Sequence, residues 1–385
     1  MKKIAIYICK ILEYINKLIP KSNKKIVFYS NLGFRDNSEA LFDYLILNNY
    51  QELYEIIIAS NDYKEIKKVD NVKYVNCVIG LYYFLTSKYF FYSFGKYPIM
   101  PSKSQVVVNL WHGMPLKKIG NMEKGKEKNK YDYFNYVLST SSYFDEIMSK
   151  SFNCSSDRIL HCGQPRTDVF YSNTMERNKL FQGYDKILIW MPTFRNSDII
   201  HESNSSNDDK ILPLISSYGE MNFLNNILIE YNSLLVIKLH PIQSKQGLSF
   251  GNLSNIVFID EKFLKDNNTS LYSFLRETDC LITDYSSVYF DYLLIQKPII
   301  FTNNDIDDYK ENRGLNFNNL EDIMPGACVK TFNDLINKIK DNLRGNDYYS
   351  EKRRSVNYIV NEYSNKNNCE FICNFIGLKK EKIYG

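Results

Sequence analysis

The chain has 385 residues, of which 44% are hydrophobic and 24% are charged, and its formal net charge is +4. These values are ordinary for a folded protein, and the length suits two domains of roughly 150–200 residues each. The net charge is too small to indicate nucleic-acid binding, and no basic stripe is interleaved with stacking aromatic residues. The eight cysteines are scattered without a CxxC pair, which favours reduced thiols over a disulfide framework or a zinc site.

The N-terminal segment 1–22 is predicted to form an amphipathic helix. Lys3, Lys10 and Lys17 recur at helical spacing, and isoleucines and leucines fill the opposite side. The segment falls short of the about 18–20 uninterrupted apolar residues that a membrane-spanning helix needs. A basic amphipathic helix can lie in the headgroup layer of a membrane, and the alternative is a surface helix that packs on its own domain.

Short apolar runs alternate with helical patterns along the rest of the chain. In the first half we expect strands at 24–30, 54–60, 73–76, 88–94, 104–111, 136–141 and 158–163. In the second half we expect them at 186–193, 234–241, 255–260, 280–287 and 297–303. Their continuous apolarity indicates parallel sheets that are covered on both faces by helices.

The sequence therefore predicts an α/β fold with two Rossmann-like, doubly wound halves in tandem. We expect the break between them at 174–185. The predicted organisation is an N-terminal helix, two lobes, and C-terminal helices that cross back to the first lobe, with boundaries at 1–22, 23–178, 179–350 and 351–385.

Polar side chains gather where the predicted strands end. His112 follows one strand, Arg195 and His240 follow two others, and Asp284 to Ser287 follow a fourth. Open parallel sheets bind ligands beyond the carboxyl ends of their strands, so this coincidence favours a functional site. Each signal is weaker alone, because a single histidine is often structural and a serine pair can simply cap a helix.

Several of these residues suit a phosphate group. Ser286 and Ser287 precede an apolar helical stretch, and a helix start offers free N–H groups to an anion. Arg166, Arg195 and Arg313 carry fork donors that match phosphate oxygens, although a plain salt bridge is an equal alternative for each. The run of lysines in 117–130 is either a solvated loop or a surface for anionic lipid or a polyphosphate acceptor.

The missing motifs narrow the chemistry. The sequence has no G-x-x-x-x-G-K-[ST] loop, no G-x-G-x-x-G fingerprint and no G-x-S-x-G elbow. The charge of a phosphate group can be met by arginine, serine and histidine side chains together with a helix dipole, so we expect no cofactor and no obligatory metal ion.

Six ordered motifs resemble the CDP-glycerol glycerophosphotransferase family, whose members prime and polymerise teichoic acids and related capsule polymers. They are NLWHGMPLKKIG, GQPRTDVFY, WMPTFR, IKLHP, ITDYSSVYFDYLLIQKPIIF and DIDDYKENRG. The resemblance extends from about residue 28 to residue 335. One departure is Met114, which stands where the family commonly has threonine.

The resemblance implies a GT-B architecture with the active site in the cleft between two lobes, and a peripheral location on the cytoplasmic face of the cell membrane. It implies that the C-terminal lobe binds a CDP-alditol and the N-terminal lobe binds the acceptor. It also implies that His112 is the general base and that His240 contacts the donor pyrophosphate as a second catalytic residue. The implied substrate-binding residues are Trp111, Gly113, Arg166, Thr193, Arg195, Asp284, Ser286, Ser287, Asp291 and Arg313.

The sequence thus predicts transfer of glycerol phosphate or ribitol phosphate from CDP-glycerol or CDP-ribitol to a hydroxyl of a glycan or poly(alditol phosphate) acceptor, with release of CMP. Two alternatives stay open at this stage. One is a nucleotide-sugar glycosyltransferase or epimerase on the same scaffold, and the other is a catalytically silent scaffold of a cell-surface polymer complex.

Overall fold

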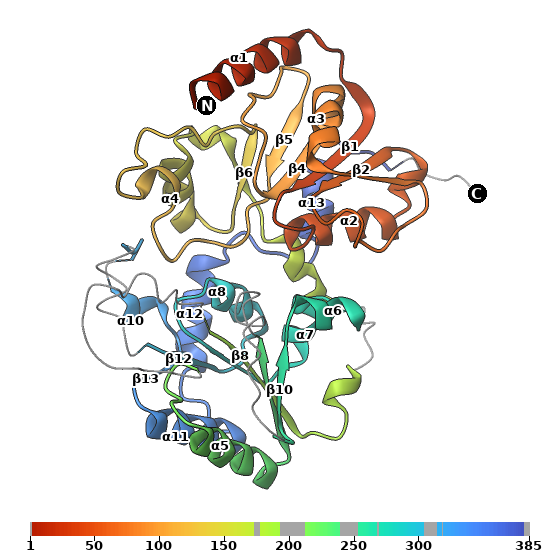
Figure 1. Ribbon diagram of the computed structural model, residues 1–385. Coiled ribbons are helices and arrows are strands. Elements are labelled where there is room, and N and C mark those ends of the chain that lie inside the picture. The colour runs from red at the N-terminus through yellow and green to blue at the C-terminus, as the bar shows by residue number, and fades with distance from the viewer. Residues whose placement is uncertain are drawn as a thin grey trace. The chain divides into compact units, whose positions relative to one another are not determined.

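The computed structural model describes residues 2–172, 178–192, 212–238, 253–267, 269–303, 314–317 and 319–380, with side chains from residue 9 onward. The chain forms two compact units (Figure 1). Unit 1 comprises Met1–Met114, Lys118–Tyr171 and Ile359–Gly385. Unit 2 comprises Pro115–Lys117 and Ser172–Tyr358.

Unit 1 is built on a seven-stranded sheet whose order is β3-β2-β1-β4-β5-β6-β7. All neighbouring strands are parallel. The strands are β1 (Ser22–Ser30), β2 (Glu55–Ser60), β3 (Val72–Val75), β4 (Ser87–Phe94), β5 (Val106–Asn109), β6 (Tyr136–Ser139) and β7 (Ile159–His161). The central strands are buried on both faces, as their continuous apolar sequences require.

Unit 2 repeats the arrangement with a six-stranded parallel sheet of order β10-β9-β8-β11-β12-β13. The strands are β8 (Lys186–Met191), β9 (Ser233–Lys238), β10 (Ile256–Ile259), β11 (Cys280–Thr283), β12 (Ile299–Thr302) and β13 (Ala327–Val329). In both sheets the chain winds outward from the first strand and then reverses to the other side. The prediction of a doubly wound α/β fold is confirmed, and the reversal lies between β1 and β4 in unit 1 and between β8 and β11 in unit 2.

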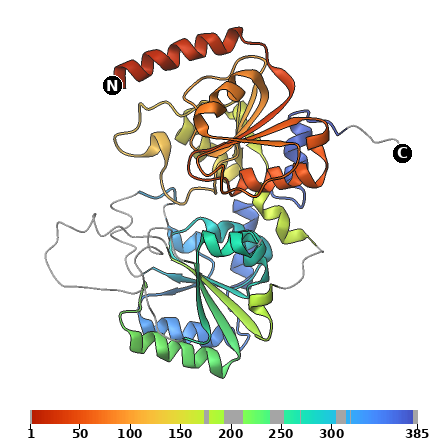
Figure 2. The same cartoon turned by 45° about the vertical axis from the view of Figure 1, so that its right-hand side comes forward.

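Unit 1 carries five α-helices among its described residues, and one of them, α13, comes from the C-terminal part of the chain. They are α1 (Lys2–Leu18), α2 (Asn37–Leu47), α3 (Cys77–Thr86), α4 (Ser142–Phe152) and α13 (Asn368–Phe375). Figure 2 shows α1 at the margin of this unit, and α13 packs beside α2. None of the helices in the described ranges combines the length and the apolarity that crossing a bilayer requires.

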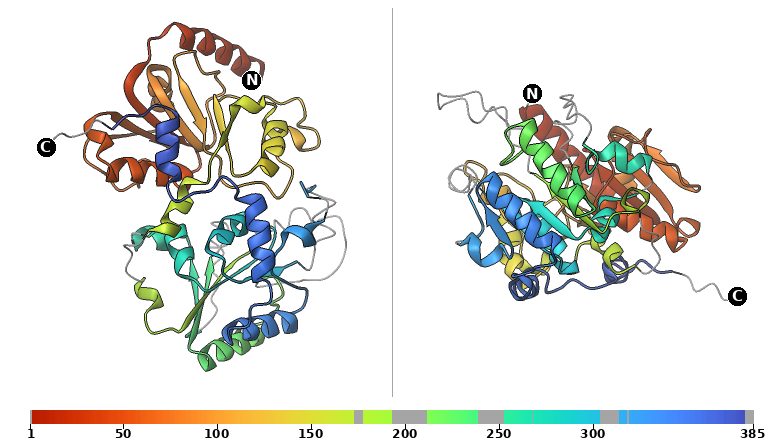
Figure 3. Two further views of the ribbon diagram at one scale, coloured as in Figure 1. Left: turned by 180° about the vertical axis from the view of Figure 1, so that it is seen from behind. Right: turned by 90° about the horizontal axis from the view of Figure 1, so that it is seen from below.

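Unit 2 carries α5 (Tyr218–Glu230), α6 (Glu261–Asp266), α7 (Leu271–Glu277), α8 (Val288–Tyr292), α10 (Leu320–Ile323), α11 (Phe332–Leu343) and most of α12 (Ser350–Val360). Helices α5 and α11 lie side by side against the sheet (Figures 1 and 3). Their apolar faces form one core cluster with β8, β9 and β11, and the cluster contains the buried Trp190 of the WMPTFR motif. That tryptophan is therefore a core residue.

Several strands are shorter than the sequence suggested, and two of them end just before a motif. We expected strands at 104–111 and 280–287, but β5 ends at Asn109 and β11 ends at Thr283. Trp111 has φ 54° and Gly113 has φ 119°, which an extended strand cannot contain. The apolar pattern did not reveal helix α3 or the short strand β13.

Candidate functional site

The ring of His112 is held between two aromatic side chains beyond the carboxyl end of β5. The ring of Phe94, the last residue of β4, stacks on it at 4.9 Å between centroids and 8° between planes. Trp111 stacks with it at 4.0 Å and 28°. Such contacts fix the plane of the imidazole, which a proton-transferring group needs.

The loop that carries His112 has an uncommon backbone. A left-handed φ in a bulky residue such as Trp111 costs of order 1–3 kcal/mol and persists only where neighbouring contacts hold it. The indole packs edge-on against Phe152 at 4.9 Å, and the backbone N–H of Trp111 donates to Asn109 Oδ1 at 3.0 Å. Met114, the departure from the family pattern, is buried.

The buried side chain of Asn37, the first residue of α2, forms hydrogen bonds with the backbone of the loop that carries His112. The Asn37 amide nitrogen donates to Leu110 O at 3.0 Å, to Trp111 O at 3.1 Å and to Gln164 Oε1. Arg166 pairs with the Asp36 carboxylate and donates to His112 O at 3.2 Å. We did not identify Asp36 and Asn37 from the sequence, although both belong to the segment in which the resemblance begins.

For Arg166 the sequence left two interpretations open, a phosphate-binding side chain and a plain salt bridge. Its side chain is only 6% exposed and forms an ion pair with Asp36. The geometry thus matches the salt-bridge alternative, with the guanidinium directed at the backbone of the His112 loop.

Another cation lies near the same edge of the sheet. Lys96 follows β4, and its Nζ lies 4.6 Å from the ring centroid of Tyr131 and 5.4 Å from that of Tyr133. Burial lowers the pKa of this lysine to about 8. An ammonium group that has lost part of its hydration favours an anionic partner, but a single lysine after a strand is no signal in a sequence. The lysines of 124–130, in contrast, are exposed, and Lys126 pairs with Glu123 at 2.6 Å.

His161 provides a structural contrast to His112. It ends β7, and its Nε2 lies 3.0 Å from Asp145 Oδ2, while its ring stacks on Tyr363 at 4.6 Å. Its side chain is 53% exposed. This histidine is satisfied by contacts within its own surroundings.

In unit 2 the D-Y-S-S motif lies where the sheet reverses direction. Thr283 Oγ1 donates to Met191 O at 2.9 Å, which ties the end of β11 to the end of β8. Asp284 is fully buried, whereas Ser286 and Ser287 are half-buried. The reversal point is where doubly wound sheets bind ligands, so the serines lie at the expected place.

The serine pair contributes little to capping α8. Ser287 is the N-cap residue but its side chain makes no capping hydrogen bond. Ser286 Oγ accepts from Val288 N at 3.5 Å, which is long for a hydrogen bond. The helix has only five residues and continues as a 3-10 turn, so its dipole adds little, and the hydroxyl groups are the stronger feature.

Asp291 lies inside unit 2. It is 2% exposed and accepts a hydrogen bond from the hydroxyl of Tyr272 on α7 at 2.5 Å. This contact links α8 to α7 below the serine pair. Four further candidates, namely Thr193, Arg195, His240 and Arg313, lie outside the described residues.

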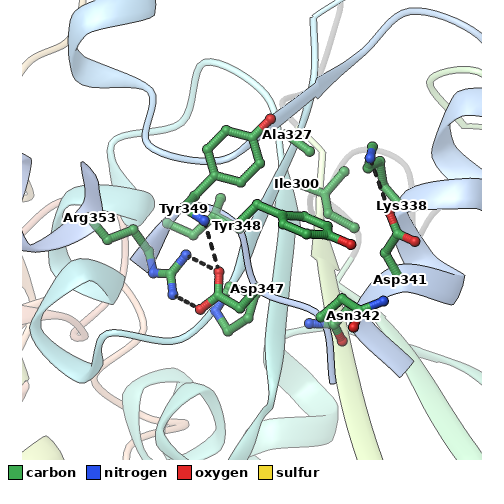
Figure 4. Close-up of a pocket in the computed structure, with 12 residues that line it drawn as sticks. Ile300, Ala327, Lys338, Asp341, Asn342, Asp347, Tyr348, Tyr349 and Arg353 are labelled. Carbon is green, nitrogen blue, oxygen red and sulfur yellow. Dashed lines mark hydrogen bonds and ion pairs between the residues drawn. The ribbon is translucent and has the colours of Figure 1, made fainter. Parts of the chain in front are cut away.

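Figure 4 shows a hollow of unit 2 near the amino ends of β12 and β13, at the other end of the sheet from the serine pair. Arg353 faces Asp347 there, with two hydrogen bonds between them, and Tyr348 and Tyr349 lie beside the pair. Arg353 also donates to Gln296 O at 3.3 Å. This arrangement anchors the start of α12. Among the described residues, no cluster of histidine, cysteine and carboxylate side chains is placed to hold a metal ion.

Comparisons with known proteins agree with the motifs. The sequence model of the family described as CDP-glycerol:poly(glycerophosphate) glycerophosphotransferase matches residues 11–378. The teichoic acid poly(glycerol phosphate) polymerase of Bacillus spizizenii is 26% identical over 368 residues, which cover 88% of this chain and 88% of that protein. The teichoic acid glycerol-phosphate primase of Bacillus subtilis is 29% identical over 289 residues, 71% of this chain and 68% of that protein.

A solved structure shares the fold. The wall teichoic acid polymerase TagF superposes with a TM-score of 0.75 at 22% identity, covering 93% of this chain and 89% of that chain. At this identity the likeness concerns the fold alone.

Proposed function

The chain belongs to the CDP-glycerol:poly(glycerophosphate) glycerophosphotransferase family, and we propose that it transfers glycerol phosphate or ribitol phosphate from a CDP-alditol to an acceptor hydroxyl in teichoic-acid or capsule synthesis. The acceptor is a glycan or a poly(alditol phosphate), and CMP is released. The observation that carries the proposal is the clamped ring of His112, which lies at a strand end within the longest motif of the first unit.

In the proposed reaction the acceptor oxygen attacks the β-phosphorus of the donor. The new O–P bond forms as the bond from that phosphorus to the bridging oxygen breaks, and the bridging oxygen leaves with its electron pair as part of CMP. The hydroxyl proton passes to the imidazole of His112. Proton transfer of this kind contributes roughly 10²–10⁴-fold to a rate.

We assign the donor diphosphate to unit 2. The hydroxyls of Ser286 and Ser287 are largely unused by their own helix, and the tie between Thr283 and Met191 holds the strand ends beneath them. Fixed donors of this kind stabilise charge that develops on phosphate oxygens. By their motif positions, Thr193, Arg195, His240 and Arg313 are proposed to join them.

Donor identity is tested by CMP release with CDP-glycerol and CDP-ribitol offered separately, each with and without acceptor. We expect acceptor-dependent release from one or both, and no protection against thermal unfolding by UDP-N-acetylglucosamine. His112→Asn should abolish release, whereas His161→Asn, a histidine of the same unit with its own partners, should leave it unchanged. Normal turnover of His112→Asn would refute the general-base assignment.

We also propose that the protein works at the inner face of the cell membrane. Ile11, Tyr14 and Leu18 form an exposed apolar stripe on α1. Helix α3 is apolar throughout, yet Val78, Ile79 and Tyr82 are exposed on it. Apolar side chains on helices flanked by lysines suit the boundary between headgroups and acyl chains of an anionic bilayer.

Membrane attachment is tested by flotation with vesicles that contain anionic lipid. Tyr14→Asp with Leu18→Asp should reduce the floated fraction at least several-fold. Leu47→Asp is the matched control, because Leu47 is also an exposed apolar residue of unit 1 but lies on α2. Equal flotation of both variants and the unaltered protein would refute the attachment surface.

A further inference from the structure

We propose that Asp36 and Asn37 are positioning residues for His112, acting together with Arg166 on the backbone of the loop that carries the imidazole. This inference rests on the proposed function, in which His112 accepts the acceptor proton. Neither Asp36 nor Asn37 touches the reacting groups in this proposal.

The hydrogen bonds of Asn37 reach the two peptide carbonyls that precede His112. Its amide nitrogen donates to Leu110 O and Trp111 O, and its own Oδ1 accepts from the backbone N–H of Arg166 at 3.2 Å. Asn37 is fully buried, so these hydrogen bonds are shielded from solvent, and a buried carbonyl that loses its donor carries a desolvation penalty. The amide thereby fixes the peptides on either side of the strained Trp111.

The next carbonyl along the loop is held by a charge pair. Arg166 Nη1 donates both to the Asp36 carboxylate and to His112 O. Asp36 Oδ1 also accepts from Asn37 N at 2.8 Å, at the start of α2. Three consecutive carbonyls, those of residues 110, 111 and 112, are therefore bound to one small network.

The network is itself attached to the core of unit 1. Helix α2 starts at Asn37 and buries Leu41, Phe42 and Leu45 beneath it. Phe42 packs edge-on against Phe28 of β1 at 5.9 Å. Buried side chains of α2 therefore connect the sheet to the residues that bind the His112 backbone.

The network of Asp36, Asn37 and Arg166 controls where the imidazole of His112 lies, because stacking already fixes the orientation of that ring. Phe94 and Trp111 stack with the imidazole, so its plane is set by the rings and its location is set by the backbone. A displacement of about 1 Å at a catalytic group lowers a rate by about 10²-fold. Loss of the network should therefore act on turnover more than on donor binding.

The test uses Asp36→Asn in the full-length protein. Asparagine is as good an N-cap as aspartate, so the start of α2 is kept while the charge pair is lost. We expect kcat for CMP release to fall about 10- to 100-fold, with KM for CDP-glycerol within about two-fold of its original value. Asp132→Asn is the matched control, because it removes the carboxylate from another ion pair of unit 1, with Arg158 at 3.2 Å.

A second readout separates positioning from general stability. The chain has only four histidines, so imidazole NMR signals can be assigned by single substitutions. The His112 signal, displaced by ring currents from Phe94 and Trp111, should move in Asp36→Asn and stay in place in Asp132→Asn. An unchanged His112 signal with unchanged kcat would overturn the inference.

In Asp36→Asn the buried Arg166 loses its carboxylate partner, and this alone could unfold the protein. A second variant therefore removes the arginine as well. Asp36→Asn with Arg166→Met leaves no unpaired charge and still removes the donor to His112 O. It should show the same fall in kcat and the same NMR displacement, and normal values of both would overturn the inference. Failure of the proposed function has a different signature, because His112→Asn would then retain activity whatever the network variants do.

Discussion

Substitution of Asp347 by asparagine should destabilise unit 2 more than removal of its partner Arg353. The Arg353 side chain is 1% exposed and that of Asp347 is 28% exposed. Asp347→Asn strands a buried guanidinium that water cannot reach, whereas Arg353→Met leaves a carboxylate that is partly hydrated. Breaking a buried ion pair lowers the free energy of unfolding by about 3–5 kcal/mol. We therefore expect Asp347→Asn to lower it by about 5 kcal/mol and Arg353→Met to lower it by about 3 kcal/mol or less.

Thermal unfolding measures this difference. For a unit of this size about 1 kcal/mol corresponds to about 2–4 °C in Tm, so a loss of about 5 kcal/mol in Asp347→Asn should lower Tm by about 10–20 °C. Lys338→Met serves as the control, because Lys338 is 38% exposed and Asp341 27% exposed, so neither partner is buried as Arg353 is and the pair is worth about 0–1 kcal/mol. If Asp347→Asn lowered Tm no more than Lys338→Met, the pair would not anchor α12 as the structure indicates.

Three further predictions follow from individual contacts. Ser286→Ala with Ser287→Ala should raise KM for CDP-glycerol about 10-fold or more without lowering Tm, and an unchanged KM in steady-state CMP release would exclude the serines from the donor site. Asp168→Asn should cost about 1–2 kcal/mol in urea unfolding, because its carboxylate accepts from the first N–H groups of α13 at 2.8–2.9 Å; an unchanged urea midpoint would contradict this. The hydrogen bonds from Arg353 lower the pKa of Asp347, so this carboxylate contributes stability above its unfolded pKa, and the contribution should be lost as pH falls below about 4. The stability difference between the unaltered protein and Asp347→Asn should shrink over that acid range, and a constant difference would show that the ion pair is not its source.

Most strands were predictable because burial on both faces gives them a continuous apolar run, although the edge strand β3 is only half-buried. That is why β1 to β12 were found with small errors at their ends. Their ends were less predictable, since apolar residues such as Trp111 continue the pattern after the backbone has turned. Helix α3 was missed because its sequence is apolar on all sides, which removes the helical period.

The site was predictable to the extent that strand ends reveal it. His112, Ser286 and Ser287 became candidates because polar residues directly after apolar runs are conspicuous in a parallel sheet, and the structure describes each of them beyond the end of a strand. Asn37 was not, because its partners Leu110 and Gln164 lie 73 and 127 residues away. Only the folded chain brings these atoms together, and an asparagine before a helical stretch is otherwise an ordinary cap.

Residues within one motif therefore differ in what they do. In GQPRTD, Arg166 binds the backbone of the His112 loop, and Asp168 caps α13 through Asn368 and Cys369. Neither side chain needs a ligand to explain its contacts, because both are largely withdrawn from solvent and already bonded. Ser287 is the opposite case, since its hydroxyl makes no capping bond. A motif residue whose side chain is satisfied within the fold supports the site, and one whose hydroxyl does not cap its own helix is the better candidate to meet the substrate.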